Sequence, residues 1–316
     1  MPNYTHLAEF AGLPVLTFTG EDDPVPPDGP PVAWRVSTLS YEGEPFAEVF
    51  ARFLEEVDTA RLTALIIGCW GFSYDVHADV PLGLLTDRAD RFPALRSLFF
   101  GEFTQEEAEI SWINQTDVSP LLTAFPELTR LRVRGGTALR FSPVEHASLR
   151  HLAFETGGLP AEAVHGVLES RLPGLEHLEL WLGDENYGGD TTIDDLRPLL
   201  DGAPSFPGLR ELGLRNAPDT DALVGPLADS ALLPRLHTLD LSLGTLGDGG
   251  AERLLAAPAF RALRRLDLHG QYLSAAAVER LRAGFADSGV AVELGDQREP
   301  YKWRDGSERR YPSVTE

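Results

Sequence analysis

Among the residues that could do chemistry, an acidic stretch stands out because its spacing partly matches a calcium-binding loop. Asp184, Asn186 and Asp195 occupy positions one, three and twelve of such a loop, with Gly189 at position six. Position five is Gly188, which has no side-chain ligand, and an aspartate stands where a bidentate glutamate is usual. These three residues are a secondary metal candidate, and we favour an acidic turn whose aspartates cap the next helix.

Other catalytic or cofactor motifs are absent from the sequence. The eight histidines fall in no H-E-x-x-H or similar ligand spacing, and no G-x-S-x-G elbow, phosphate-binding loop or dinucleotide fingerprint occurs. The single cysteine, Cys69, permits no internal disulfide and no thiolate zinc cluster, and the sequence shows no base beside it, so we expect a buried structural thiol. We therefore expect no catalytic residue, no cofactor and no enzymatic activity.

Charge and composition narrow the class of partner. The 316 residues include 49 acidic and 27 basic side chains, a formal net charge of −22, which would repel a nucleic acid backbone. The hydrophobic and charged fractions, 43% and 24%, are those of an ordinary globular protein. We find neither a run of about 18 apolar residues nor the pattern of a secretory signal, so we expect a cytoplasmic protein with no membrane partner.

A repeated phrase, L-x-x-L-x-L, predicts the elements that position the polar residues. Its first leucines stand at positions 62, 95, 128, 149, 175, 209, 236 and 263. The L-x-L alternation predicts a short strand with one buried face, and the rest of each period must return to start the next parallel strand, usually through a helix. Helical spacing in 161–168, 248–256 and 274–282 supports such returns.

The predicted fold is an α/β leucine-rich-repeat solenoid, a horseshoe with a parallel concave sheet, about eight repeats and terminal caps. One repeat cannot bury its leucines alone, whereas stacked repeats bury them in a continuous core.

Two resemblances accompany the repeat. The segment Leu239–Leu255 resembles the ribonuclease-inhibitor type of leucine-rich repeat, with a strand, a short turn and a helix that opens on Gly-Asp-x-Gly-Ala. The whole chain resembles a family of uncharacterised bacterial leucine-rich-repeat proteins through Leu7–Pro14, Glu109–Gln115 and Glu155–Pro160. The family resemblance implies no established activity, but it suggests an accessory role beside an enzyme produced with it. The ninth repeat position, often Asn or Cys, is most often Gly here, so we expect glycine turns in place of an asparagine ladder.

We divide the chain into three parts. Residues 1–61 are predicted to form an N-terminal capping segment of strands and a helix, which would cover Ile66 and Phe99 of the first repeats. Residues 62–294 form the solenoid, with a degenerate ninth strand at 290–294. Residues 295–316 form a C-terminal cap hairpin, turning at Asp305-Gly306, or a tail, and we favour the cap.

Side chains between the strand leucines would point into the concave groove, and they supply the candidate binding residues. Five arginines face five carboxylates there, a balanced face on an acidic protein, and Arg and Trp often carry binding energy at interfaces. The candidates are Arg130, Arg132, Arg134, His151, Glu155, His177, Glu179, Trp181, Arg215, Asp240, Arg265, Asp267 and His269.

Two alternatives remain open for this groove. Opposite charges on adjacent strands could simply pair, Arg130, Arg132 and Arg134 with Glu155 in particular. Trp181 could pack against an insertion instead of a partner. The loop residues Trp112, Asn114 and Gln115 are weaker binding candidates, and the alternative for them is docking of their insertion onto the solenoid.

The sequence thus predicts a non-catalytic interaction or scaffold module that binds a partner protein through the concave face and adjacent loops. The alternative function is a small-ligand or metal-binding sensor or enzyme that uses the groove or the 184–195 loop. A third possibility is scaffolding through self-association.

Overall fold

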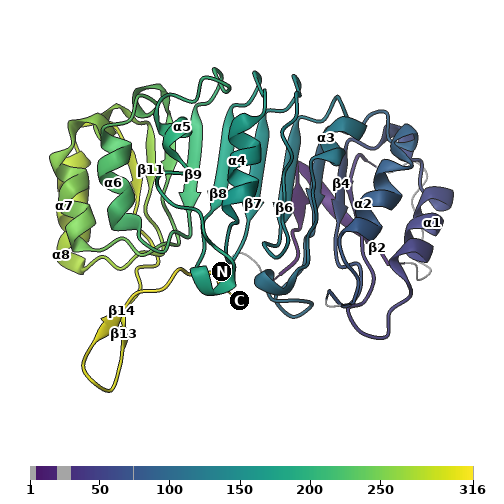
Figure 1. The fold of residues 1–316 in the computed structure, drawn as a ribbon, viewed down its shortest axis with the longest axis horizontal. Coiled ribbons are helices and arrows are strands. Elements are labelled where there is room, and N and C mark those ends of the chain that lie inside the picture. Colours follow the sequence, from purple (N-terminus) through teal and green to yellow (C-terminus); the bar gives the residue numbers. More distant parts are fainter. Residues whose placement is uncertain (1–4, 20–29, 74, 316) are drawn as a thin grey trace.

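The computed structural model describes residues 5–19, 30–73 and 75–315, which form one long sheet with helices on one side (Figure 1). Twelve strands follow one another across this sheet in chain order; β2 to β12 are parallel, and β1 is antiparallel to β2. The strands are β1 (Glu9–Phe10), β2 (Leu13–Phe18), β3 (Ala33–Val36), β4 (Ala64–Ile67), β5 (Ser97–Phe100), β6 (Arg130–Arg134), β7 (His151–Glu155), β8 (His177–Trp181), β9 (Glu211–Arg215), β10 (Thr238–Asp240), β11 (Arg265–Asp267) and β12 (Ala291–Glu293).

The leucine phrases set the register of this sheet. The second leucine of each phrase pairs with that of the next strand, from Leu65 on β4 to Leu266 on β11, and every member of this row is buried. Burial of a leucine side chain contributes roughly 1.5–3 kcal/mol, so the row forms a continuous core between sheet and helices. This arrangement, a parallel sheet with one strand per coil, is a leucine-rich-repeat-like solenoid.

Helices return the chain from one strand to the next on a single side of the sheet (Figure 1). The α-helices are α1 (Phe46–Glu56), α2 (Asp79–Thr86), α3 (Pro120–Ala124), α4 (Ala161–Glu169), α5 (Arg197–Leu200), α6 (Thr220–Ala228), α7 (Asp248–Ala256) and α8 (Ala275–Phe285). Six short 3-10 helices are η1 (Thr59–Arg61), η2 (Ala89–Arg91), η3 (Ile110–Trp112), η4 (Glu185–Tyr187), η5 (Leu233–Arg235) and η6 (Pro258–Ala262). Ser274 caps α8 by accepting a hydrogen bond from Ala277 N. Within the described ranges, no helix has the length and apolarity that a bilayer crossing requires.

The sheet extends beyond the eight leucine phrases at both ends. Residues 13–18 and 33–36, which we expected in a capping segment, form β2 and β3 and pair in parallel with the later strands. At the other end, β12 continues the sheet where a degenerate strand was expected. The parallel sheet therefore starts before residue 62, and the division of the chain at that residue stays a prediction.

The C-terminal segment leaves the sheet and then returns to it. Strands β13 (Tyr301–Lys302) and β14 (Glu308–Arg309) form an antiparallel hairpin that projects from the body (Figure 1). Its turn is at the expected place, with Gly306 at φ +85° and Ser307 N donating to the Asp305 carboxylate. Beyond the hairpin, Ser313 N donates to Leu243 O at 2.8 Å, which returns the chain to the carboxyl ends of the strands.

Candidate functional site

The candidate residues lie on the face of the sheet opposite the helices, which we call the inner face. Because strand side chains alternate, residues flanking each buried leucine form two polar rows across the sheet. The first row runs Arg130, His151, His177, Glu211, Thr238 and Arg265, and all six are partly or fully exposed. The second row runs Arg132, Ala153, Glu179, Gly213, Asp240 and Asp267.

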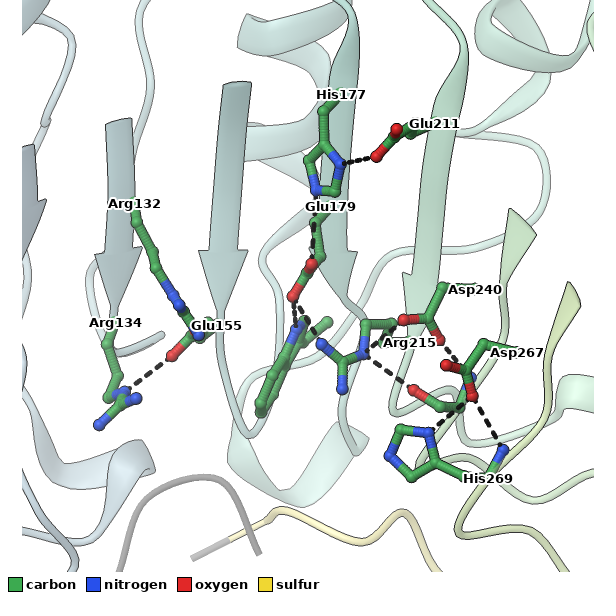
Figure 2. Close-up of polar contacts among 12 residues, drawn as sticks. Arg132, Arg134, Glu155, His177, Glu179, Glu211, Arg215, Asp240, Asp267 and His269 are labelled. Carbon is green, nitrogen blue, oxygen red and sulfur yellow. Dashed lines mark hydrogen bonds and ion pairs between the residues drawn. The ribbon is translucent and has the colours of Figure 1, made fainter. Parts of the chain in front are cut away.

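A buried carboxylate joins two of the predicted arginines. Glu155 is fully buried and accepts hydrogen bonds from Arg132 Nε and, at 2.8 Å, from Arg134 Nε (Figure 2). Arg134 is only 2% exposed and also donates to Phe103 O. Both guanidinium groups lie over the Phe99 ring, at 4.8 and 5.2 Å from its centroid. Arg132 and Arg134 thus show the pairing that was the alternative interpretation, and Arg134 and Glu155 present no surface to a partner.

A second cluster is centred on Arg215. Its Nη1 donates to Glu179 at 2.9 Å, and its Nε lies 3.4 Å from Asp240 (Figure 2). The guanidinium stacks on Trp181, 4.8 Å from the ring centroid, and the indole N–H donates to Glu179. Burial disfavours the Glu179 charge, but its bonds to His177, Arg215 and Trp181 outweigh this and lower its pKa. Burial raises the pKa of Asp240.

Two histidines on neighbouring strands have pKa values shifted in opposite directions. The ring centroids of His151 and His177 are 5.4 Å apart, and the rings are tilted by 36° to each other. His177 lies between Glu211, 3.0 Å from Nδ1, and Glu179, 3.5 Å from Nε2 (Figure 2). Burial disfavours the charged His177 ring, but these two carboxylates raise its pKa overall. Burial, together with Arg130 and His177, lowers the pKa of His151 to about 4, so this ring is neutral at pH 7.

The last polar group of the inner face is centred on Asp267. Arg265 donates to its Oδ2 at 2.8 Å, and the ring of His269 lies 2.7 Å from its Oδ1 (Figure 2). Burial disfavours the Asp267 charge, but the contacts with His269 and Arg265 lower its pKa to about 2. The hydrogen bond to Asp267 raises the pKa of His269. Arg265 stays exposed despite its ion pair.

The N-terminal segment covers the inner face at β4 and β5. Phe10 packs on Phe99, with 6.2 Å between ring centroids, and both cluster with the buried Ile66. This placement confirms the expectation that Ile66 and Phe99 lie under the N-terminal segment. Glu102 holds the segment in place because it accepts from Leu7 N at 2.8 Å and from Arg35 Nε at 2.6 Å.

The C-terminal tail covers Trp181. Val314 is buried with Trp181, Ile110 and Leu243 in a small apolar cluster. The Asn216 side chain donates to Val314 O and accepts from Val314 N at 2.9 Å, which fixes the tail backbone in both directions. Trp181 is 1% exposed and is therefore not available to a partner while the tail is in place. Trp181 thus packs against the C-terminal tail and also against Ile110 of the insertion.

Of the three loop candidates, two hold the insertion in place and the third is exposed. Asn114 Nδ2 donates to Ser73 O at 2.6 Å, and the buried Gln115 donates from Nε2 to Arg134 O at 2.7 Å. These two amides hold the insertion on the solenoid. Trp112 is 44% exposed, and its indole N–H donates to Glu109 at 2.7 Å.

The aspartates of the acidic loop, Asp184 and Asp195, bind different partners. Asp184 accepts from the backbone and side-chain nitrogens of Asn186, at 2.9 and 2.7 Å, and begins η4. Asp195 instead accepts from Thr192 and contacts His165 at 2.7 Å. Across the described residues, no three His, Cys, Asp or Glu side chains come together in a group that could hold a metal ion. Asp184 caps the short helix η4, whereas α5, the next α-helix, has no side-chain cap, so the expected capping is found only for η4.

Two features of the site were missed by sequence reasoning. The Arg35–Glu102 pair joins residues 67 positions apart, and its only signal was an arginine inside a predicted strand. The hydrogen bonds between Asn216 and Val314 of the tail join residues 98 positions apart, and Asn216 has a positive φ of 54° that no motif indicates.

Cys69 is buried, and burial raises its thiol pKa to about 12.

Comparison with known proteins yields matches among solved structures. No family model and no curated protein matches the chain. A crystal structure of a protein from Bacteroides fragilis, a structural genomics target, is 32% identical with a TM-score of 0.75, and the match covers 79% of this chain and 70% of that one. TLR13 in complex with ssRNA13 is 16% identical with a TM-score of 0.39, and the match covers 87% of this chain and 37% of TLR13.

Proposed function

This chain belongs to the same family as the Bacteroides fragilis protein, and we propose that it is a non-catalytic interaction module that binds another protein through its inner face. Six consecutive strands, β6 to β11, contribute partly or fully exposed side chains to the first polar row. The helices lie on the other side of the sheet (Figure 1). This exposed row is the observation that carries the proposal.

As far as the structure describes them, the two chain ends leave this row accessible. The N-terminal segment covers Ile66 and Phe99 on β4 and β5, before the row starts. The C-terminal tail packs on Trp181, at the carboxyl end of β8 and away from His177 at its start. A partner can therefore contact the row without displacing either end.

The inner face is also pre-organised for binding. Its second row is held by ion pairs, those of Arg132 with Glu155 and of Arg215 with Glu179, before any partner arrives. A surface whose side chains are already ordered loses less conformational entropy on association. Five arginines and five carboxylates balance on this face although the chain carries a net charge of −22, so this face repels an acidic partner less than the rest of the surface does.

Chemistry of the buried groups supports a role without catalysis. A nucleophilic cysteine must ionise, and burial of Cys69 raises its pKa to about 12. Two carboxylates of the inner face, Glu155 and Glu179, are paired with arginines. Paired in this way, these two carboxylates hold side chains in position and are not free to act as general bases.

The test is affinity capture with matched charge reversals. The face variant is Arg265→Glu with Glu211→Arg, which reverses two exposed residues of the first row. The control is Arg280→Glu with Glu252→Arg, an exposed pair on α8 and α7 whose partners are 2.8 Å apart. We expect proteins captured by wild type and control to be lost from the face variant, with all three chains melting at the same temperature. Identical capture by all three would refute the inner face as the binding surface.

A further inference from the structure

An open pocket of about 460 Å³ lies where the inner face meets the N-terminal segment. Ser97, Thr129, Arg130 and His151 line it from the amino-terminal ends of β5 to β7, and Gly12 lines it from the β1–β2 turn. The pocket therefore sits at one end of the exposed first row, beside the residues that the proposed function uses.

Arg130 differs from the other arginines of the inner face. Arg132, Arg215 and Arg265 each contact a carboxylate, whereas Arg130 has no hydrogen-bond acceptor and no ion-pair partner within the described part of the chain. Its side chain is nevertheless half-buried. Burial, with a contribution from Arg132, lowers its pKa, because a cation removed from water without a counter-charge is disfavoured.

Two further donors line the same pocket and are also unused. Ser97 is 7% exposed, and its hydroxyl has no hydrogen bond within the described ranges. The His151 ring lies beside that of His177, with 5.4 Å between centroids, and has no hydrogen bond among the described residues. Since its pKa is about 4, it is neutral at pH 7 and carries one N–H donor. A charged donor and two neutral donors thus surround one space.

We propose that this pocket, which we call the Arg130 pocket, binds a single carboxylate, supplied by an aspartate or glutamate side chain of the partner protein. The inference rests on the proposed function. A guanidinium takes a carboxylate through two parallel hydrogen bonds, and Arg130 is the arginine of this pocket without a hydrogen-bond or ion-pair partner among the described residues. The neighbouring Arg150 is already used, since it lies 3.7 Å from Glu176 and donates to Ala147 O at 2.8 Å.

The rim of the pocket favours a carboxylate over a phosphate group. Glu9 and Glu176 also line the pocket, and Glu9 is exposed. A dianion would be repelled by these carboxylates and would meet only one free guanidinium, whereas a monoanion is neutralised by Arg130 alone. The chemical class is therefore a monovalent carboxylate on a side chain long enough to enter from the inner face.

The test uses a small probe in place of the partner. N-acetyl-glutamate N-methylamide has one carboxylate, and its glutamine counterpart has none. With the full chain at pH 7, we expect the glutamate probe to shift the NMR signals of the Arg130 Nε–H and the His151 ring saturably, with a dissociation constant on the order of millimolar. The glutamine probe should leave both signals unchanged. Equal shifts with the two probes, or tighter binding of inorganic phosphate, would overturn the proposal.

Two variants complete the test. Arg130→Gln should weaken the probe at least tenfold, and its melting temperature should equal or exceed that of wild type because it removes an unpaired cation. Arg265→Gln, an exposed arginine of the same row, should bind the probe as wild type does. If Arg130→Gln still binds the glutamate probe as wild type does, Arg130 does not bind the carboxylate and the proposal is wrong. A third outcome separates the two proposals. If Arg130→Gln captures the same proteins as wild type while the charge-reversed variant at Arg265 and Glu211 loses them, the Arg130 pocket does not bind the partner, and the inner face still does.

Discussion

Replacement of Glu155 by glutamine should be among the most destabilising single changes on the inner face. Glu155→Gln keeps the shape of the side chain but removes the charge that holds Arg132 and Arg134. Arg132 can turn toward water because its side chain is 29% exposed, whereas the side chain of Arg134 is 3% exposed and stays buried as an unpaired cation. Removal of one partner from a buried pair typically costs about 3–5 kcal/mol.

The predicted cost translates into a measurable melting shift. An unfolding entropy of roughly 2.1 cal/mol/K per residue over 316 residues is about 0.66 kcal/mol/K, so the melting temperature should fall by about 5–8 °C. Circular dichroism melts at pH 7 measure it. Glu211→Gln is the matched control, since Glu211 is exposed and pairs with His177, and such surface pairs contribute about 0–1 kcal/mol. Adding Arg134→Met to Glu155→Gln should restore part of the loss.

The reasoning would be refuted by a melting temperature of Glu155→Gln that matches that of Glu211→Gln. Such a result would mean that the Arg134 cation finds water or another acceptor when its carboxylate is gone. Failure of Arg134→Met to recover any stability in the double variant would show instead that glutamine itself, and not the stranded cation, causes the loss.

Three further predictions concern the chain ends and the thiol. The hydrogen bond to Glu102 raises the pKa of His6 to about 9, so its stabilising effect is complete below pH 6.5 and is lost as pH rises to 9. Urea melts should show a fall of at most about 1 kcal/mol over that range, because the ring is partly exposed, and His6→Gln should abolish it. Asn216→Gly keeps the positive φ but frees the backbone of Val314, so the Val314 amide should exchange roughly 30-fold faster, corresponding to about 2 kcal/mol. If the Val314 amide of this variant exchanges as slowly as in wild type, the Asn216 side chain does not hold the tail. Cys69 should react with a thiol reagent at pH 8 only after denaturant unfolds the chain, and prompt labelling of the folded chain would show that it is not buried.

The pairing across the inner face was only partly predictable. The periodicity placed Arg132, Arg134 and Glu155 on one face of neighbouring strands, and it offered both partner binding and mutual pairing as interpretations. Register and rotamers decided between them, since Glu155 lies directly beside Arg134 in the β6–β7 ladder. Arg130, with the same residue type and spacing, has no hydrogen-bond or ion-pair partner within the described ranges, although Glu9 of the N-terminal segment lines the pocket beside it.

By itself, the sequence determined the features that depend on short stretches of chain. The leucine phrase places Leu65 and its successors in one buried row, Ser274 begins α8, and Asp305-Gly306 turns the hairpin. Each of these depends on residues a few positions apart, so local geometry and the burial of apolar side chains suffice to specify it.

Only the tertiary structure decided where the two chain ends lie. Leu7 meets Glu102 across 95 positions, and Val314 meets Asn216 across 98. Such contacts depend on the accumulated stacking of several coils, which sets where a distant loop stands relative to the end of the chain. No periodicity within one repeat contains that information. The exposed row from Arg130 to Arg265 therefore depends both on the leucine period and on where residues 7–10 and 313–315 pack.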